Sequence, residues 1–273
     1  MTADGPNVLG IILEASPQAA VSCMSKDYVH VIEAVTTLAS VHMTSYRNGE
    51  IVILAALPGK TKVLYLSDKG RTMSDMRSII LERLHNEIIL YTNSTRGSRA
   101  VCLDMAISRF LLHINNRKRV IELISALSTI TGKRVIIFKV TDDVPGQYNA
   151  TMNSIFAAKQ CKIAIDACVL TDKASLFLKQ ATHLTRGIFV HLPSKVSAPD
   201  FHATILTVFS AQARSSLRLP VLDDIDQRPA CRCHYPPHLR DHGWVCTRCF
   251  SVYCDSQLVC SCQKAGEQVL YSP

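Results

Sequence analysis

The chain has 273 residues, of which 48% are hydrophobic and 19% are charged, and its formal net charge is +8. These proportions exclude an intrinsically disordered chain and predict a sizeable core, with room for one large domain and a small one. No apolar run reaches the roughly eighteen residues of a membrane span, because Asp166 interrupts the longest candidate. We therefore expect no membrane association.

The first 210 residues alternate between apolar runs typical of buried strands and segments with the periodicity of amphipathic helices. We expect strands over 8–15, 51–57, 62–66, 134–140, 161–170 and 187–192. We expect helices over 28–46, 75–91, 101–114, 120–130, 152–159, 174–184 and 200–211. This order predicts an α/β domain with an open, mostly parallel sheet covered by helices on both faces.

Two features of this region concern turns. The sequence Pro58-Gly59-Lys60-Thr61 predicts a tight hairpin between the second and third strands. The longest basic run, Arg117-Lys118-Arg119, falls between two expected helices. It is interpreted as a solvated turn, with contact to a phosphate backbone as the alternative.

The domain boundary is expected after residue 213. Residues 214–229 contain two prolines and an acidic stretch around Asp223 and Asp224, which is typical of a linker. The sequence therefore divides into an α/β domain over 1–213, a linker over 214–229 and a small module over 230–273.

The order of elements resembles the von Willebrand factor A fold, which is Rossmann-like. When that fold binds a divalent ion, it carries Asp-x-Ser-x-Ser after the first strand, because a carboxylate and two hydroxyls are hard oxygen ligands for Mg²⁺. Here Glu14, Ser16 and Gln18 occupy those positions, and Asp142 follows a later strand. Since two of the three residues differ, we do not expect Mg²⁺ to be held there.

No catalytic arrangement is evident elsewhere. The sequence contains no nucleophile elbow, no P-loop and no glycine-rich dinucleotide fingerprint after a strand. Asp166 lies in an apolar strand and is expected to accept hydrogen bonds from a neighbouring loop. We therefore predict that the chain is not an enzyme.

Seven of the eleven cysteines lie in the last fifth of the chain. We expect no export signal at the start of the sequence, and a reducing compartment favours zinc over disulfides. The best four-thiolate set is Cys231, Cys233, Cys246 and Cys249. A second set would comprise His234, Cys254, Cys260 and Cys262, so the module holds one ion or two. Neither set leaves an open coordination position, which predicts a structural zinc site.

Two other zinc-binding classes fit this module less well. A ubiquitin ligase of the RING class requires paired CxxC units around a C-x-H, and the first pair here is CxC instead. A base-reading finger requires basic residues on a helix between its ligand pairs. Arg232, Arg240 and Arg248 are scattered, although nucleic-acid binding through the finger stays an alternative.

Two segments together resemble one family. The sequence NSIFAAKQCKIAIDACVL, residues 153–170, is similar to a helix–strand signature of the general transcription factor IIH subunit 3 family. The sequence ACRCHYPPHLRDHGWVCTRCFSVYCDSQLVCSC, residues 230–262, resembles the zinc finger of that family. The chain departs from the family pattern at Cys260 and Cys262, where CxC replaces CxxC.

The resemblance implies a non-catalytic structural subunit of the TFIIH core complex, which is nuclear and acts in RNA polymerase II transcription initiation and nucleotide-excision repair. The implied partner is the larger core subunit that has its own von Willebrand A-like domain and RING-type finger. Through that subunit the chain would support the TFIIH helicases. A free-standing, metal-dependent ligand-binding A domain is the alternative.

Overall fold

The structure is a computed structural model of the chain. It describes residues 6–16, 27–67, 75–92, 100–124, 130–192, 197–210, 244–246 and 252–254. The expected linker over 214–229 and most of the expected module over 230–273 lie outside the described residues.

The elements alternate as the sequence predicts, and most of their bounds agree within a few residues. The strands are β1 (Asn7–Glu14), β2 (Gly49–Leu57), β3 (Lys60–Leu66), β4 (Gly132–Lys139), β5 (Ala164–Val169), β6 (Phe189–His191), β7 (Trp244–Val245) and β8 (Val252–Tyr253). The helices are α2 (Asp27–Ser45), α3 (Met76–Thr92), α4 (Leu103–Ile124), the 3₁₀ turn η2 (Pro145–Gln147), α5 (Tyr148–Gln160), α6 (Leu176–Thr185) and α7 (Ala198–Phe209).

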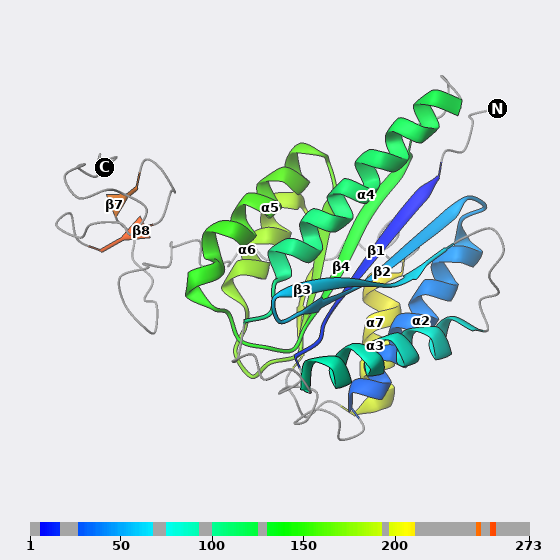
Figure 1. Ribbon diagram of the computed structural model, residues 1–273, viewed down its shortest axis with the longest axis horizontal. Helices are drawn as coiled ribbons and strands as arrows, with labels where there is room; N and C mark the ends of the chain where they lie inside the picture. Colours follow the sequence, from blue (N-terminus) through cyan, green and yellow to red (C-terminus); the bar gives the residue numbers. More distant parts are fainter. Residues whose placement is uncertain are drawn as a thin grey trace.

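Six strands form one sheet in the order β3-β2-β1-β4-β5-β6 (Figure 1). All neighbouring pairs are parallel except β2 and β3, which form the predicted hairpin. Gly59 lies in the turn with a φ of 71°, a conformation that glycine adopts without steric cost. The mostly parallel sheet with one antiparallel edge strand is confirmed.

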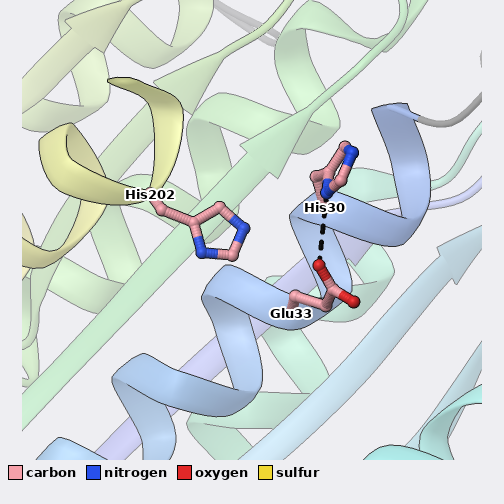
Figure 2. Close-up of side chains that lie close together, drawn as sticks. All are labelled: His30, Glu33 and His202. Carbon is pink, nitrogen blue, oxygen red and sulfur yellow. Dashed lines mark hydrogen bonds and ion pairs between the residues drawn. The ribbon is translucent and has the colours of Figure 1, made fainter. Parts of the chain in front are cut away.

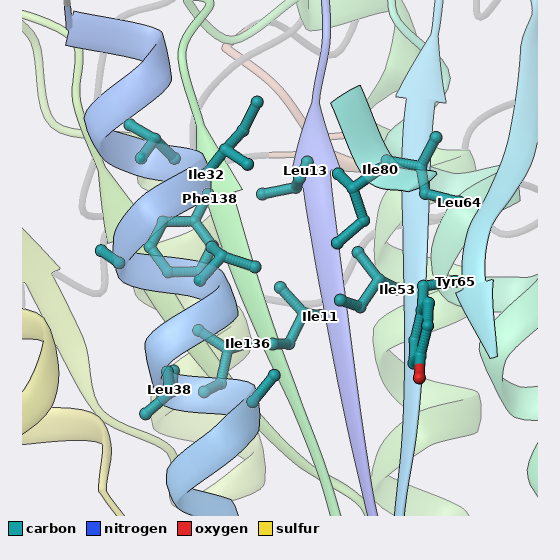
Figure 3. Close-up of a cluster of buried hydrophobic side chains, with 14 of the residues drawn as sticks. Ile11, Leu13, Ile32, Leu38, Ile53, Leu64, Tyr65, Ile80, Ile136 and Phe138 are labelled. Atoms are coloured by element: carbon teal, nitrogen blue, oxygen red, sulfur yellow. The ribbon is translucent and has the colours of Figure 1, made fainter. Parts of the chain in front are cut away.

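Each face of the sheet is covered by three helices and carries its own hydrophobic cluster. Leu9, Ile11 and Leu13 of β1 face α2, α3 and α7, as Figure 3 shows for the residues labelled there. Val8 and Ile12 of the same strand belong to the cluster beneath α4, α5 and α6. A strand buried on both faces has no polar side, which explains the continuous apolar runs.

The region between residues 101 and 130 differs from the expectation. We expected two helices separated by a turn at Arg117-Lys118-Arg119, and this was wrong: α4 runs without a break from Leu103 to Ile124. Arg117 lies on the helix and donates from Nε to Glu50 Oε2 at 2.9 Å. A basic run breaks the apolar pattern without breaking a helix, because arginine and lysine are good helix formers.

A smaller correction concerns β5. Cys161 was expected at the start of this strand, but it is exposed and follows the last residue of α5. The strand begins at Ala164.

Asp166 in β5 is fully buried and links this strand to β4 and to the segment that leads into β6. Its Oδ1 accepts a hydrogen bond from the backbone N–H of Ile188 at 2.7 Å, and its other oxygen forms an ion pair with Arg134 of β4. The expectation that Asp166 accepts a hydrogen bond from a neighbouring loop is confirmed. In the described part of the chain, no helix combines the length and apolar character that a bilayer crossing requires.

Candidate functional site

The first candidate site lies at the carboxyl edge of the sheet, where parallel strands of an α/β domain end together and ligands usually bind. Glu14 is the last residue of β1, and Lys139 is the last residue of β4. Both side chains are buried, with 2% and 7% of their surfaces exposed. Two opposite charges therefore lie together at this buried edge of the sheet.

The Glu14 carboxylate is held by the segment that leaves β4. Its Oε2 accepts hydrogen bonds from the backbone N–H groups of Val140 and Thr141, both at 2.8 Å. Its Oε1 lies 3.3 Å from Nζ of Lys139. The buried carboxylate thus has a fixed orientation and a cation beside it.

The same ammonium group extends the network to helix α6. Lys139 Nζ lies 3.5 Å from Oδ1 of Asp143, which also accepts from the Ser175 hydroxyl at 2.7 Å. Ser175 is the N-cap of α6, and its Oγ accepts from the backbone N–H of Leu178 at 3.2 Å. Lys139 therefore bridges Glu14, at the end of β1, and Asp143, which follows β4.

This arrangement bears on the divalent-ion hypothesis. Asp142, the acidic residue expected at the site, is exposed, and its neighbour Asp143 faces the network instead. Gln18 lies outside the described residues, and Ser16 is buried beside Glu14. Since an ammonium group already compensates the charge of Glu14, the geometry favours an internal ion pair over Mg²⁺ at this edge.

Sequence reasoning missed Lys139 and Asp143, although one signal was present. Lys139 ends the apolar strand RVIIFK, and a charge within a buried strand requires a partner. That partner, Glu14, is 125 positions away in the sequence. Only the parallel pairing of β1 with β4 brings the two together.

The second candidate site is the cysteine cluster. Of the eight expected zinc ligands, Cys246 and Cys254 are described, and Cys231, Cys233, His234, Cys249, Cys260 and Cys262 lie outside the described residues. Cys246 is fully buried and directly follows β7, and Cys254 is partly buried and directly follows β8. The two strands are antiparallel, with Trp244 opposite Tyr253. Each described cysteine therefore directly follows one strand of this antiparallel pair.

The register separates these cysteines. Val245 pairs with Val252, so Cys246 and Cys254 leave the ladder at opposite ends. Their positions are offset by three residues, or roughly 10 Å along the strands at about 3.4 Å per residue.

The fold and the first site define a von Willebrand A-like domain with a buried ion pair at the carboxyl edge of its sheet. A solved structure with the same fold is the crystal structure of the TFIIH p34 N-terminal domain, with a TM-score of 0.63 and 23% identity. That match covers 76% of this chain and 99% of the solved chain. The model of the transcription factor Tfb4 family matches residues 6–264, and the chain belongs to this family.

Curated relatives agree with this assignment. The chain is 29% identical over 214 residues to general transcription factor IIH subunit 3 of Dictyostelium discoideum, a match that covers 78% of this chain and only half of the relative. It is 28% identical over 276 residues to the general transcription and DNA repair factor IIH subunit tfb4 of Schizosaccharomyces pombe, which covers 94% of this chain and 88% of the relative. The family is one of structural TFIIH subunits rather than enzymes.

Proposed function

We propose that this chain is a non-catalytic structural subunit of the nuclear TFIIH core complex that acts in RNA polymerase II transcription initiation and nucleotide-excision repair. It pairs with the larger core subunit that has its own von Willebrand A-like domain and RING-type finger. Membership of the Tfb4 family carries this proposal.

An exposed apolar stripe along α4 supports a role in assembly. Met105, Leu112 and Leu123 are 44%, 68% and 86% exposed. Separations of seven and eleven residues return to nearly the same face of a helix, so the three side chains form a line about 27 Å long at about 1.5 Å per residue. A partner that covers this face of α4 would bury all three side chains.

The stripe can be tested with a paired variant. Leu112→Ser together with Leu123→Ser should reduce co-purification of the larger core subunit by tenfold or more. The control is Leu90→Ser on α3, where a leucine of similar exposure, 61%, lies on a helix of the opposite sheet face. If the native chain, the double variant and Leu90→Ser recover equal amounts of the partner, α4 is not part of the interface.

For the cysteine module we propose structural zinc, with domain bounds at 1–213 and 230–273. The β7–β8 register favours two ions, because it sets the backbone positions of Cys246 and Cys254 roughly 10 Å apart along the strands, whereas thiolates bound to one zinc lie about 4 Å apart. Cys246 would then share an ion with Cys231, Cys233 and Cys249, and Cys254 would share the other with His234, Cys260 and Cys262.

Elemental analysis of the purified complex provides the test. The native chain should hold two zinc ions, and Cys254→Ser should hold one. If the native chain and Cys254→Ser each hold one zinc ion, the second site is excluded. A native chain that holds no metal and has oxidised thiols would exclude both zinc sites.

A further inference from the structure

A second potential metal-binding cluster lies far from the cysteines in sequence, between α2 and α7 (Figure 2). His30 and Glu33 lie one turn apart on α2, and His202 lies on α7. One ligand atom from each side chain lies within 4.8 Å of the other two. Two imidazoles and a carboxylate converging from two helices form the type of donor set that binds transition-metal ions.

Two of the three donors already have the spacing of metal ligands. His30 Nδ1 lies 3.2 Å from Glu33 Oε2. Ligands at about 2.0–2.1 Å from a tetrahedral zinc lie about 3.3 Å apart. His30 and Glu33 are therefore as far apart as two ligands of one ion. A rotation of the His202 side chain toward them would complete the ligand set.

The third donor has an unsatisfied atom. His202 Nε2 is buried and has no hydrogen-bond partner within the described residues. Figure 2 shows the His202 ring turned toward the other two side chains, and its centroid lies 6.1 Å from that of His30. A buried polar nitrogen without a partner is costly, and coordination to a metal would satisfy it.

One carboxylate oxygen of Glu33 is held by a neighbouring helix. Arg77 on α3 donates to Glu33 Oε1 at 2.6 Å, which leaves Oε2 for the cluster and fixes the carboxylate as an outer-shell partner does in metal sites. The remaining oxygen, Oε2, is the atom that faces His30.

The geometry points to a metal site formed by His30, Glu33 and His202 that binds a divalent transition ion of the zinc and nickel class and clamps α7 onto α2. The remaining coordination position would be filled by water, because the protein supplies three ligands. The site is independent of the cysteine module. It would hold α7 against α2.

Nickel binding to the untagged full chain, purified without excess zinc, tests this inference. Isothermal titration with Ni²⁺ should show one saturable site in the native chain, and the site should be lost in His202→Ala. Glu33→Gln should weaken binding tenfold or more. His183→Ala, which removes an exposed histidine of α6 outside the cluster, should bind like the native chain.

Two further measurements separate this site from alternatives. Bound Ni²⁺ should give weak d–d absorption without a thiolate charge-transfer band, and it should raise the melting temperature of the native chain but not of His202→Ala. Circular dichroism before nickel addition reports whether each variant folds. If His202→Ala does not fold, His30→Ala takes its place in the titration. Equal nickel affinity in the native, His30→Ala and Glu33→Gln chains, or a thiolate band, would overturn the inference.

Discussion

Buried charges in the α/β domain connect strands that are distant in the sequence. Glu14 and Lys139 join the carboxyl ends of β1 and β4, and Asp166 pairs with Arg134 between β5 and β4. Each of these carboxylates also accepts backbone hydrogen bonds. Breaking a buried pair leaves one charge without compensation, which costs more than the intact pair contributes.

Lys139→Met should therefore destabilise the domain by roughly 3–5 kcal/mol, because Glu14 and Asp143 would lose their shared cation. Urea unfolding of the zinc-loaded chain measures this effect. Lys118→Met is the matched control, since Lys118 pairs with Glu122 on the exposed face of α4 at 3.6 Å. The control should change stability by less than about 0.5 kcal/mol. Equal effects of the two substitutions would contradict the role assigned to Lys139.

His42 should make the free energy of unfolding of the domain depend on pH. The residue is buried on α2, and its Nε2 donates to the backbone oxygen of Asn7 at 3.1 Å. Burial lowers the pKa of His42, Arg134 contributes in the same direction, and the hydrogen bond to Asn7 opposes them. Burial also lowers the pKa of His113 on α4.

The sign of the dependence follows from these directions. As the pH falls below about 6.5, the unfolded chain binds protons that the folded chain does not, so the free energy of unfolding should fall. His42→Gln keeps a hydrogen-bond donor and should make this fall less steep between pH 7 and pH 5. Urea unfolding at several pH values provides the measurement, with His183→Gln as the exposed control. An unchanged slope in His42→Gln would show that His42 does not carry the effect.

At the scale of elements, the chain between α6 and β6 packs closely against β5. A Cβ atom on Gly187 would lie 1.7 Å from the backbone oxygen of Ile165. The obstacle is backbone, so no side-chain rotation relieves it. Gly187 allows the edge strand β6 to pair with β5.

Gly187→Ala should accordingly destabilise the domain by about 3 kcal/mol, the upper end of the usual range for overpacking. Gly146→Ala serves as the comparison, because nothing lies within 4 Å of a Cβ built there. It should change stability by less than about 0.5 kcal/mol. Thermal unfolding of both chains tests the difference, and equal melting temperatures would refute the steric argument.

The length of α4 illustrates what local patterns leave open. The basic residues from Arg117 to Arg119 interrupt the apolar periodicity, so the sequence favoured a turn. In the structure, Arg117 reaches across to Glu50 at the start of β2, and the helix continues to Ile124. The partner lies 67 residues away and is not visible in a window of helix length.

At the scale of the whole molecule, the two parts of the chain should unfold separately. Cys246 is fully buried, and a serine at this position cannot replace a thiolate ligand. Cys246→Ser should unfold the cysteine module and weaken partner binding, while residues 6–210 retain their fold. Limited proteolysis with mass spectrometry measures both outcomes. A variant with full zinc content and native protection of the module would contradict the ligand assignment.

The sequence by itself determined the strand and helix order, the mostly parallel sheet, the burial of Asp166 and the family resemblance, because each depends on local periodicity or on a contiguous motif. Tertiary structure decided which side chains meet. Strand pairing places Lys139 beside Glu14, and the packing of α7 on α2 places His202 beside His30 and Glu33. Contacts of this kind depend on the register and packing of elements distant in sequence, which no local pattern encodes.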